Sequence, residues 1–170
     1  MIGANNLMKI DATDIKILNI LQRQGRITNT ALAKEIEISP PPTLERVKKL
    51  EKNGVIVKYV ALVDPVAVGI GTHTFVEVML RGHTKDNVTA FIDAAQAMDE
   101  IMECHHVTGD ADFLIKIAVK DIPSYEQLVL HKLTTLPHVS NLKTMVVLST
   151  FKHETAYDVE GVNNGNKNDA

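Results

Sequence analysis

Cationic and small polar side chains gather in one segment of the first third of the chain. Leu44, Val47 and Leu50 recur there every three residues, a spacing that predicts a helix with one apolar face. Lysine and arginine on the other faces of such a helix can contact phosphates, and residues of its first turn can reach base edges. We interpret residues of about 30–49 as a helix-turn-helix that binds double-stranded DNA. The candidate contacts are Ser39, Pro41, Pro42, Thr43, Arg46, Lys48 and Lys49.

The adjacent residues Cys104, His105 and His106 are the strongest candidates for a metal site or a nucleophile. Alternation along a strand puts Cys104 and His106 on one face and His105 on the other, which divides the set. The sequence contains no Cys-x-x-Cys, His-Glu-x-x-His or paired-carboxylate pattern and no glycine-rich phosphate loop. We therefore expect no catalytic residues, no metal and no cofactor, and we predict that the protein is not an enzyme.

Length, charge and cysteine content favour a two-part protein of the cytoplasm. The chain has 170 residues, and residues 1–64 hold 10 Lys+Arg against 7 Asp+Glu, whereas the rest holds 8 against 14. A basic first part beside an acidic second part suggests two tasks, one of them on a polyanion. A single cysteine fits a reducing compartment. No apolar run is long enough for a membrane span and no secretory signal is visible, so we expect no membrane partner.

The first domain is expected over residues 10–64. A helix begins near Ile10, with Asp11 and Asp14 at its start, and a second short helix is capped by Thr28 or Asn29. Ser39 is the expected N-cap of the third helix, with Pro40 in its first position. The β-branched run 55–63 follows as an extended wing. Three helices and a wing are the order of a winged helix-turn-helix.

The second domain is expected over residues 73–157, after a linker at 65–72 and before a disordered tail at 158–170. Alternation predicts strands at 73–81, 101–108, 113–119 and 139–149, with a possible edge strand at 150–157. Helices open at Thr84 and at Ser124, where Gln127 completes a capping box. The fold class is therefore α+β, an N-terminal winged helix-turn-helix followed by a βαββαβ ferredoxin-like sandwich.

One face of the predicted sheet is left without a covering layer. Helices cover the other face, yet the uncovered face also carries apolar side chains. We expect a second copy of the chain to cover it, which makes the protein a homo-oligomer. The residues concerned are Phe75, Met79, Leu114, Met145 and Val147.

Two groups of motifs resemble one known family. The first domain contributes Asp11–Leu18, Gly25–Ile27, Leu32–Ala33, Ser39–Pro40, Glu45–Val47 and Leu50–Ile56, and the second contributes Glu103–Leu114 and Leu136–Val139. Together they resemble the feast/famine regulators, the leucine-responsive regulatory protein/AsnC family. The resemblance covers residues of about 10–150 and keeps both motif groups in order.

The resemblance implies a transcriptional regulator that forms dimers, often octamers, and responds to an amino acid bound between dimers. Backbone N–H groups around Gly109 can hold its carboxylate, and Asp112, or its rival Asp110, can hold its ammonium. Without the resemblance these residues indicate only a tight turn. The effector residues that it implies are His106, Val107, Thr108, Gly109, Asp110, Asp112, Ile122, Met145, Val146 and Val147.

Two features depart from the family pattern, and one alternative function stays open. Glu37 stands where the family usually has glycine, at a cost of about 1 kcal/mol if its backbone is left-handed. The run Pro40–Pro42 stiffens the start of the recognition helix and removes N–H donors there. The alternative function is a small-molecule-sensing oligomeric domain that acts through a protein partner instead of DNA.

Overall fold

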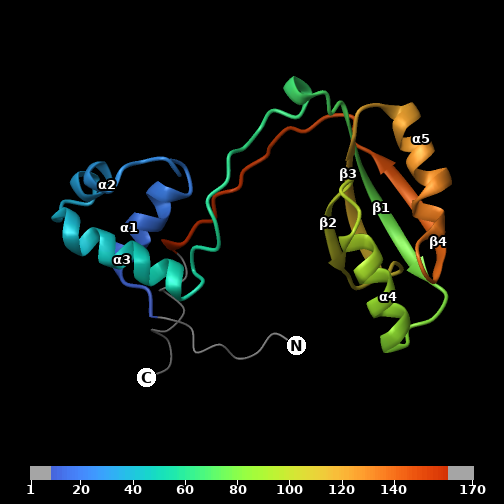
Figure 1. The fold of residues 1–170 in the computed structure, drawn as a ribbon, viewed down its shortest axis with the longest axis horizontal. Coiled ribbons are helices and arrows are strands. Elements are labelled where there is room, and N and C mark those ends of the chain that lie inside the picture. Colours follow the sequence, from blue (N-terminus) through green and yellow to red (C-terminus); the bar gives the residue numbers. More distant parts are fainter. Residues whose placement is uncertain (1–8, 161–170) are drawn as a thin grey trace. The chain divides into compact units, whose positions relative to one another are not determined.

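The computed structural model describes residues 9–160, which divide into two units (Figure 1). One unit comprises the chain up to Leu62 together with the segment from Lys152 onward, and the other comprises Val63–Phe151. Most of the tail expected at 158–170 lies outside the described residues.

Three helices form the first unit: α1 (Ala12–Leu21), α2 (Asn29–Glu35) and α3 (Pro40–Lys52). Asp11 and Asp14 form a reciprocal capping box at the start of α1, and Thr28 caps α2 through a hydrogen bond to Ala31 N. Apolar side chains from all three helices meet in one core, which holds the helices together. The fully or nearly fully buried members are Ile17, Leu18, Leu32, Ile36 and Leu50.

The wing predicted at residues 55–63 does not form a strand. Its β-branched side chains favour an extended backbone, but a strand also needs a hydrogen-bonded neighbour, and none is present in the described part of the chain. Val55 and Ile56 pack against the helical core, whereas the run turns away from it at Val57, whose side chain is 84% exposed.

The C-terminal segment returns to the helical unit. Tyr157 N donates to Gln22 Oε1 at 2.7 Å, and Gln22 Nε2 donates to Tyr157 O at 3.1 Å. Val159 packs against the helical core. The edge strand suggested at 150–157 is therefore absent, and the segment completes the helical unit, whereas the sequence placed it with the second domain.

The second unit is a four-stranded antiparallel sheet covered by two helices (Figure 1). The strands are β1 (Thr72–Leu80), β2 (Ile101–His106), β3 (Phe113–Val119) and β4 (Val139–Val146), and the helices are α4 (Lys85–Gln96) and α5 (Ile122–His131). The strand order is β2-β3-β1-β4, with β3 between β1 and β2. This confirms the α+β class and the βαββαβ arrangement.

The helix α5 begins earlier than the sequence indicated. Asp121 is its N-cap, and Asp121 Oδ1 accepts from Ser124 N at 2.8 Å and from Ser124 Oγ at 2.6 Å. These hydrogen bonds lower the pKa of the Asp121 carboxyl. The predicted Ser124–Gln127 capping box is wrong because the aspartate three residues upstream already satisfies the free amide.

Glu37 has a φ of 59°, the left-handed conformation that the sequence left open. We predict that Glu37→Gly stabilises the protein by about 1 kcal/mol, because glycine adopts this backbone without a steric penalty. Glu35→Gly is the matched control, and it should destabilise by a similar amount because Glu35 is the last residue of α2. Chemical denaturation measures both. A stability loss for Glu37→Gly would contradict the assignment of strain to this turn.

Candidate functional site

The exposed surface of α3 is cationic. Ser39, Pro41 and Pro42 face solvent at its start, and Lys48 and Lys49 face solvent further along. Lys49 makes no ion pair with any residue between 9 and 160. Lys48 Nζ lies 3.6 Å from Glu45 Oε1, and both side chains are exposed. Exposed ammonium groups on a helix suit phosphate contacts.

The prolines change what the first turn of α3 can offer. Ser39 is the N-cap, but its side chain makes no capping hydrogen bond, because Pro41 and Pro42 have no N–H to donate. Helix N-termini usually bind anions through such free N–H groups. This turn therefore offers the apolar proline rings and the Ser39 hydroxyl at its surface.

The structure corrects the prediction for Thr43. Its side chain is fully buried, and its Oγ1 donates to Ser39 O at 2.9 Å. A hydroxyl placed in this way stabilises the first turn of the helix and does not face a partner. Thr43 is therefore not a candidate base contact.

Arg46 is held by the start of α1 and does not extend freely into solvent. Its Nη1 donates to Asp11 Oδ2 at 2.6 Å and to Asp14 Oδ1 at 2.8 Å. The Asp14 side chain is only 3% exposed, whereas the Arg46 side chain is 35% exposed, so only the Asp14 carboxylate is shielded from water. In this structure Arg46 joins α3 to the start of α1, and its contact with DNA stays a prediction.

The capping box and the ion pairs reinforce each other. The Asp14 amide and the Arg46 guanidinium lower the pKa of the Asp11 carboxyl. The two carboxylates in turn raise the pKa of Arg46. The sequence showed two acidic residues at a helix start, a common capping pattern, and gave no signal that an arginine 32 residues further along would meet them.

A second contact orders the chain after α3. The Tyr59 hydroxyl lies 3.0 Å from Glu51 Oε1. Burial, together with this carboxylate, raises the pKa of Tyr59 to about 12. The phenol stays protonated and continues to donate to Glu51, which fixes the extended segment beside the helix.

The loop between β2 and β3 is closed by its own backbone. Val107 N donates to Asp112 O at 3.0 Å, and Asp112 N donates to Val78 O at 3.0 Å. Gly109 has a φ of 118°, a conformation that side chains rarely adopt. The predicted tight turn is therefore present and requires glycine.

Asp112 is already occupied within the chain. Its Oδ2 accepts from Leu80 N at 2.8 Å, and its Oδ1 lies 2.7 Å from His83 Nε2. The Leu80 hydrogen bond and then the histidine lower the pKa of the Asp112 carboxyl. Asp110 is exposed, and its carboxylate receives no hydrogen bond from any described residue. His83 was missed because nothing in the sequence connects the end of β1 with this loop.

The remaining predicted effector residues lie in two places. His106 is exposed at the end of β2, with its ring centroid 5.0 Å from that of Phe113. Met145 and Val146 pair with β1 at Phe75 and Thr74, whereas the loop joins β1 at Val78. Four residues of strand separate these positions by about 13 Å. The second group also contains Ile122, which is exposed, and Val147, which is half-buried.

The uncovered sheet face combines apolar side chains with ion pairs. The core residues of β1 alternate with half-buried residues that face away from the helices, among them Phe75 and Met79. Between the apolar residues, Lys143 pairs with Glu77 at 3.1 Å. Phe75 and Met79 therefore lie on the uncovered face, as the alternation in the sequence predicted, and an ion pair lies between them.

The cysteine and histidines of β2 do not converge on a metal. Cys104 is half-buried, and burial raises the pKa of its thiol. His105 points to Glu103, at 3.2 Å. Within residues 9–160 there is no cluster of three metal-binding side chains and no helix long and apolar enough to span a membrane.

Comparison with known families covers both units. Residues 10–57 match the model of a winged helix-turn-helix DNA-binding domain, and residues 73–157 match the Lrp/AsnC ligand binding domain. The chain belongs to the Lrp/AsnC family of transcriptional regulators. It is thus a regulator with a DNA-binding domain and a ligand-binding domain, which sets aside the alternative without DNA.

Relatives and solved structures of the Lrp/AsnC family agree over most of the chain. Over 143 residues the chain is 46% identical to the leucine-responsive regulatory protein of Haemophilus influenzae, covering 84% of this chain and 86% of that protein. It is 41% identical to the leucine-responsive regulatory protein of Escherichia coli K12, covering 84% and 87%. A transcriptional regulator of Neisseria meningitidis, solved as a complex with L-Met, has a TM-score of 0.87 and 33% identity, covering 91% of this chain and 99% of that chain.

We predict that Asp112→Ala lowers the free energy of unfolding of this Lrp/AsnC protein by about 1–3 kcal/mol, because Leu80 N loses its acceptor. Since the folded-state pKa of Asp112 is depressed, the effect should be full above about pH 5 and should vanish as the pH falls through the folded pKa. Denaturation of parent and variant across pH measures this. Asp110→Ala is the control and should leave stability unchanged; equal losses in both variants would contradict the structural role of Asp112.

Proposed function

We propose that α3 enters the major groove of DNA, with its proline-containing first turn towards the bases and Lys48 and Lys49 on phosphates. The observation that carries this proposal is the fixation of α3 by Arg46, which leaves the first turn and the lysines exposed. Pro41 and Pro42 present apolar rings there, and the thymine methyl group is the matching feature of a base edge. Because its target is DNA, we place the protein in the cytoplasm.

We propose that a second copy covers the open sheet face and makes a homodimer, from which larger even assemblies such as octamers can form. A two-fold dimer presents two recognition helices, so the operator should be a pseudo-palindrome. Phe75 and Met79 support this proposal, since a half-apolar sheet face without a covering layer is suited to a partner. The pair Lys143–Glu77 would give the interface its register.

We propose that the loop 107–112 binds an amino acid. Backbone N–H groups around Gly109 would hold the carboxylate, and the free Asp110 carboxylate would hold the ammonium. The apolar residues Ile122, Met145, Val146 and Val147 lie at the other end of the sheet, so they would have to come from another copy. The L-Met in the related Neisseria meningitidis regulator and the naming of the relatives support an apolar amino acid as the effector.

For DNA binding, we expect Lys49→Gln to weaken affinity for all DNA sequences. The slope of log K against log salt concentration should become less steep by about one unit. The reason is the loss of one phosphate contact. The measurement is a fluorescence-anisotropy titration of a selected operator at several salt concentrations. Lys85→Gln, an exposed lysine of the other unit, is the control. An unchanged slope in Lys49→Gln would move the DNA contact to another surface.

For the effector, we expect Asp110→Asn to weaken binding of leucine or methionine ten-fold to a hundred-fold, as the loss of a charge-assisted contact should. Binding of DNA without effector should stay close to the parent's. Calorimetric titration of each amino acid into parent and variant measures the first effect. If Asp110→Asn binds as well as the parent, the loop is only a turn and the site lies elsewhere.

A further inference from the structure

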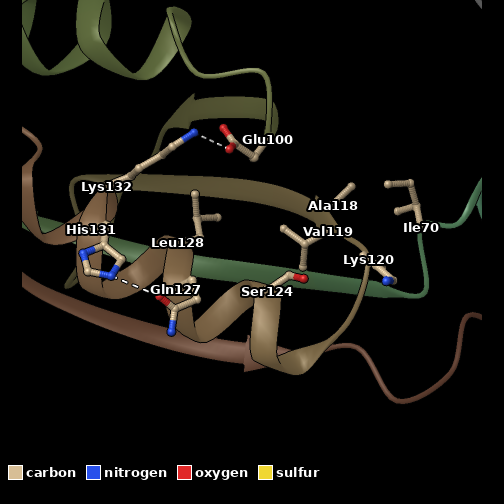
Figure 2. Close-up of a pocket in the computed structure, with 10 residues that line it drawn as sticks. All are labelled: Ile70, Glu100, Ala118, Val119, Lys120, Ser124, Gln127, Leu128, His131 and Lys132. Atoms are coloured by element: carbon tan, nitrogen blue, oxygen red, sulfur yellow. Dashed lines mark hydrogen bonds and ion pairs between the residues drawn. The ribbon is translucent and has the colours of Figure 1, made fainter.

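A pocket of about 450 Å³ lies in the second unit at the end of β3, where the linker enters the sheet. This volume is within the usual range for small-molecule sites, about 300–1,000 Å³. Figure 2 shows Leu128 and Val119 in the middle of the pocket, with Ile70 of the linker opposite the helix. The interior is therefore apolar and would receive a hydrocarbon chain.

Polar side chains surround this apolar interior, and most are already paired. Lys132 forms an ion pair with Glu100, and His131 Nε2 lies 3.0 Å from Gln127 Oε1 (Figure 2). The Lys132 charge is thus neutralised, and the Glu100 carboxylate is not free for a ligand. The effect of Lys132 is visible in the lowered pKa of Glu100.

Lys120 is the cation of the pocket that has no hydrogen-bonded partner, although the neighbouring Asp121 carboxylate interacts with its charge. Its ammonium makes no hydrogen bond or ion pair with the residues described from 9 to 160. The neighbouring Asp121 is the N-cap of α5, and its Oδ1 accepts hydrogen bonds from the amide and the hydroxyl of Ser124. The pocket therefore offers one ammonium without an ion pair among the described residues beside an apolar interior, and its only lining carboxylate, Glu100, is paired with Lys132.

The linker wall of the pocket is fixed by its backbone. Gly71 N donates to Lys120 O at 3.0 Å, and Ile70 N donates to Pro65 O at 2.8 Å. A Cβ on Gly71 would lie 2.9 Å from Lys120 O, so only glycine permits this approach. A wall held in this way is in place before a ligand arrives, which reduces the entropic cost of binding.

We propose that this pocket binds a small carboxylate with a branched or straight apolar chain and no amino group. The carboxylate would contact Lys120, and the chain would lie along Leu128 and Ile70. A free amino acid fits less well, because no carboxylate is left for its ammonium. Within one chain the pocket lies away from the loop 107–112, since β3 runs six residues, about 20 Å, between Phe113 and Val119.

The test uses 4-methylpentanoate, which is leucine without its amino group, with the full-length protein. Calorimetric titration should show binding to the parent and at least ten-fold weaker binding to Lys120→Gln, as expected for one charge-assisted contact. Lys85→Gln should bind like the parent. The neutral 4-methylpentan-1-ol and the cationic 3-methylbutylamine should bind at least ten-fold more weakly than the carboxylate.

Methyl NMR of the same protein locates the ligand without a substitution. 4-Methylpentanoate should shift the methyl signals of Ile70 and Leu128 and leave those of Leu18 in the other unit unchanged. Asp110→Asn should weaken leucine binding and should not alter 4-methylpentanoate binding, so the loop site can fail while this site holds. Absence of binding to the parent, equal affinity in Lys120→Gln, or shifts only outside the pocket would overturn the proposal.

Discussion

The DNA-binding unit depends on one guanidinium placed between two carboxylates. Arg46 comes from the recognition helix, and Asp11 and Asp14 come from the first turn of α1, where they also cap that helix. The two carboxylates therefore cap the start of α1 and also hold α3 in its orientation through Arg46. Breaking a buried ion pair costs about 3–5 kcal/mol, and since the Arg46 side chain is 35% exposed we expect about 1–3 kcal/mol here.

Asp112 plays a comparable part in the ligand-binding unit. Its carboxylate joins the loop 107–112 to the end of β1 through Leu80 N and His83. Asp112, which the sequence suggested as a ligand contact, thus stabilises the fold, whereas Asp110 is exposed at the surface. In both units a charged side chain that the sequence offered as a ligand or DNA contact instead joins neighbouring elements of its own unit.

Periodicity predicted the three N-terminal helices and the four-stranded sheet with its two helices, but it also predicted strands at 55–63 and 150–157 that do not form. The spacing of Leu44 and Leu50 predicted α3, the alternation along β1 and β3 predicted the sheet, and Gly109 predicted the turn. The role of Arg46, the return of Tyr157 to Gln22 and the pocket at Lys120 could not be predicted in this way. They depend on contacts between residues far apart in the chain, for which no local pattern exists.

The most direct test of the role of Arg46 combines stability with DNA specificity in Arg46→Ala. Denaturation should show a loss of about 1–3 kcal/mol in the DNA-binding unit. Affinity should fall by a similar factor for an operator and for its variants substituted at each base pair, because a displaced helix weakens every contact. Unchanged stability together with relaxed preference at a single base pair would show that Arg46 reads a base, and it would contradict this account.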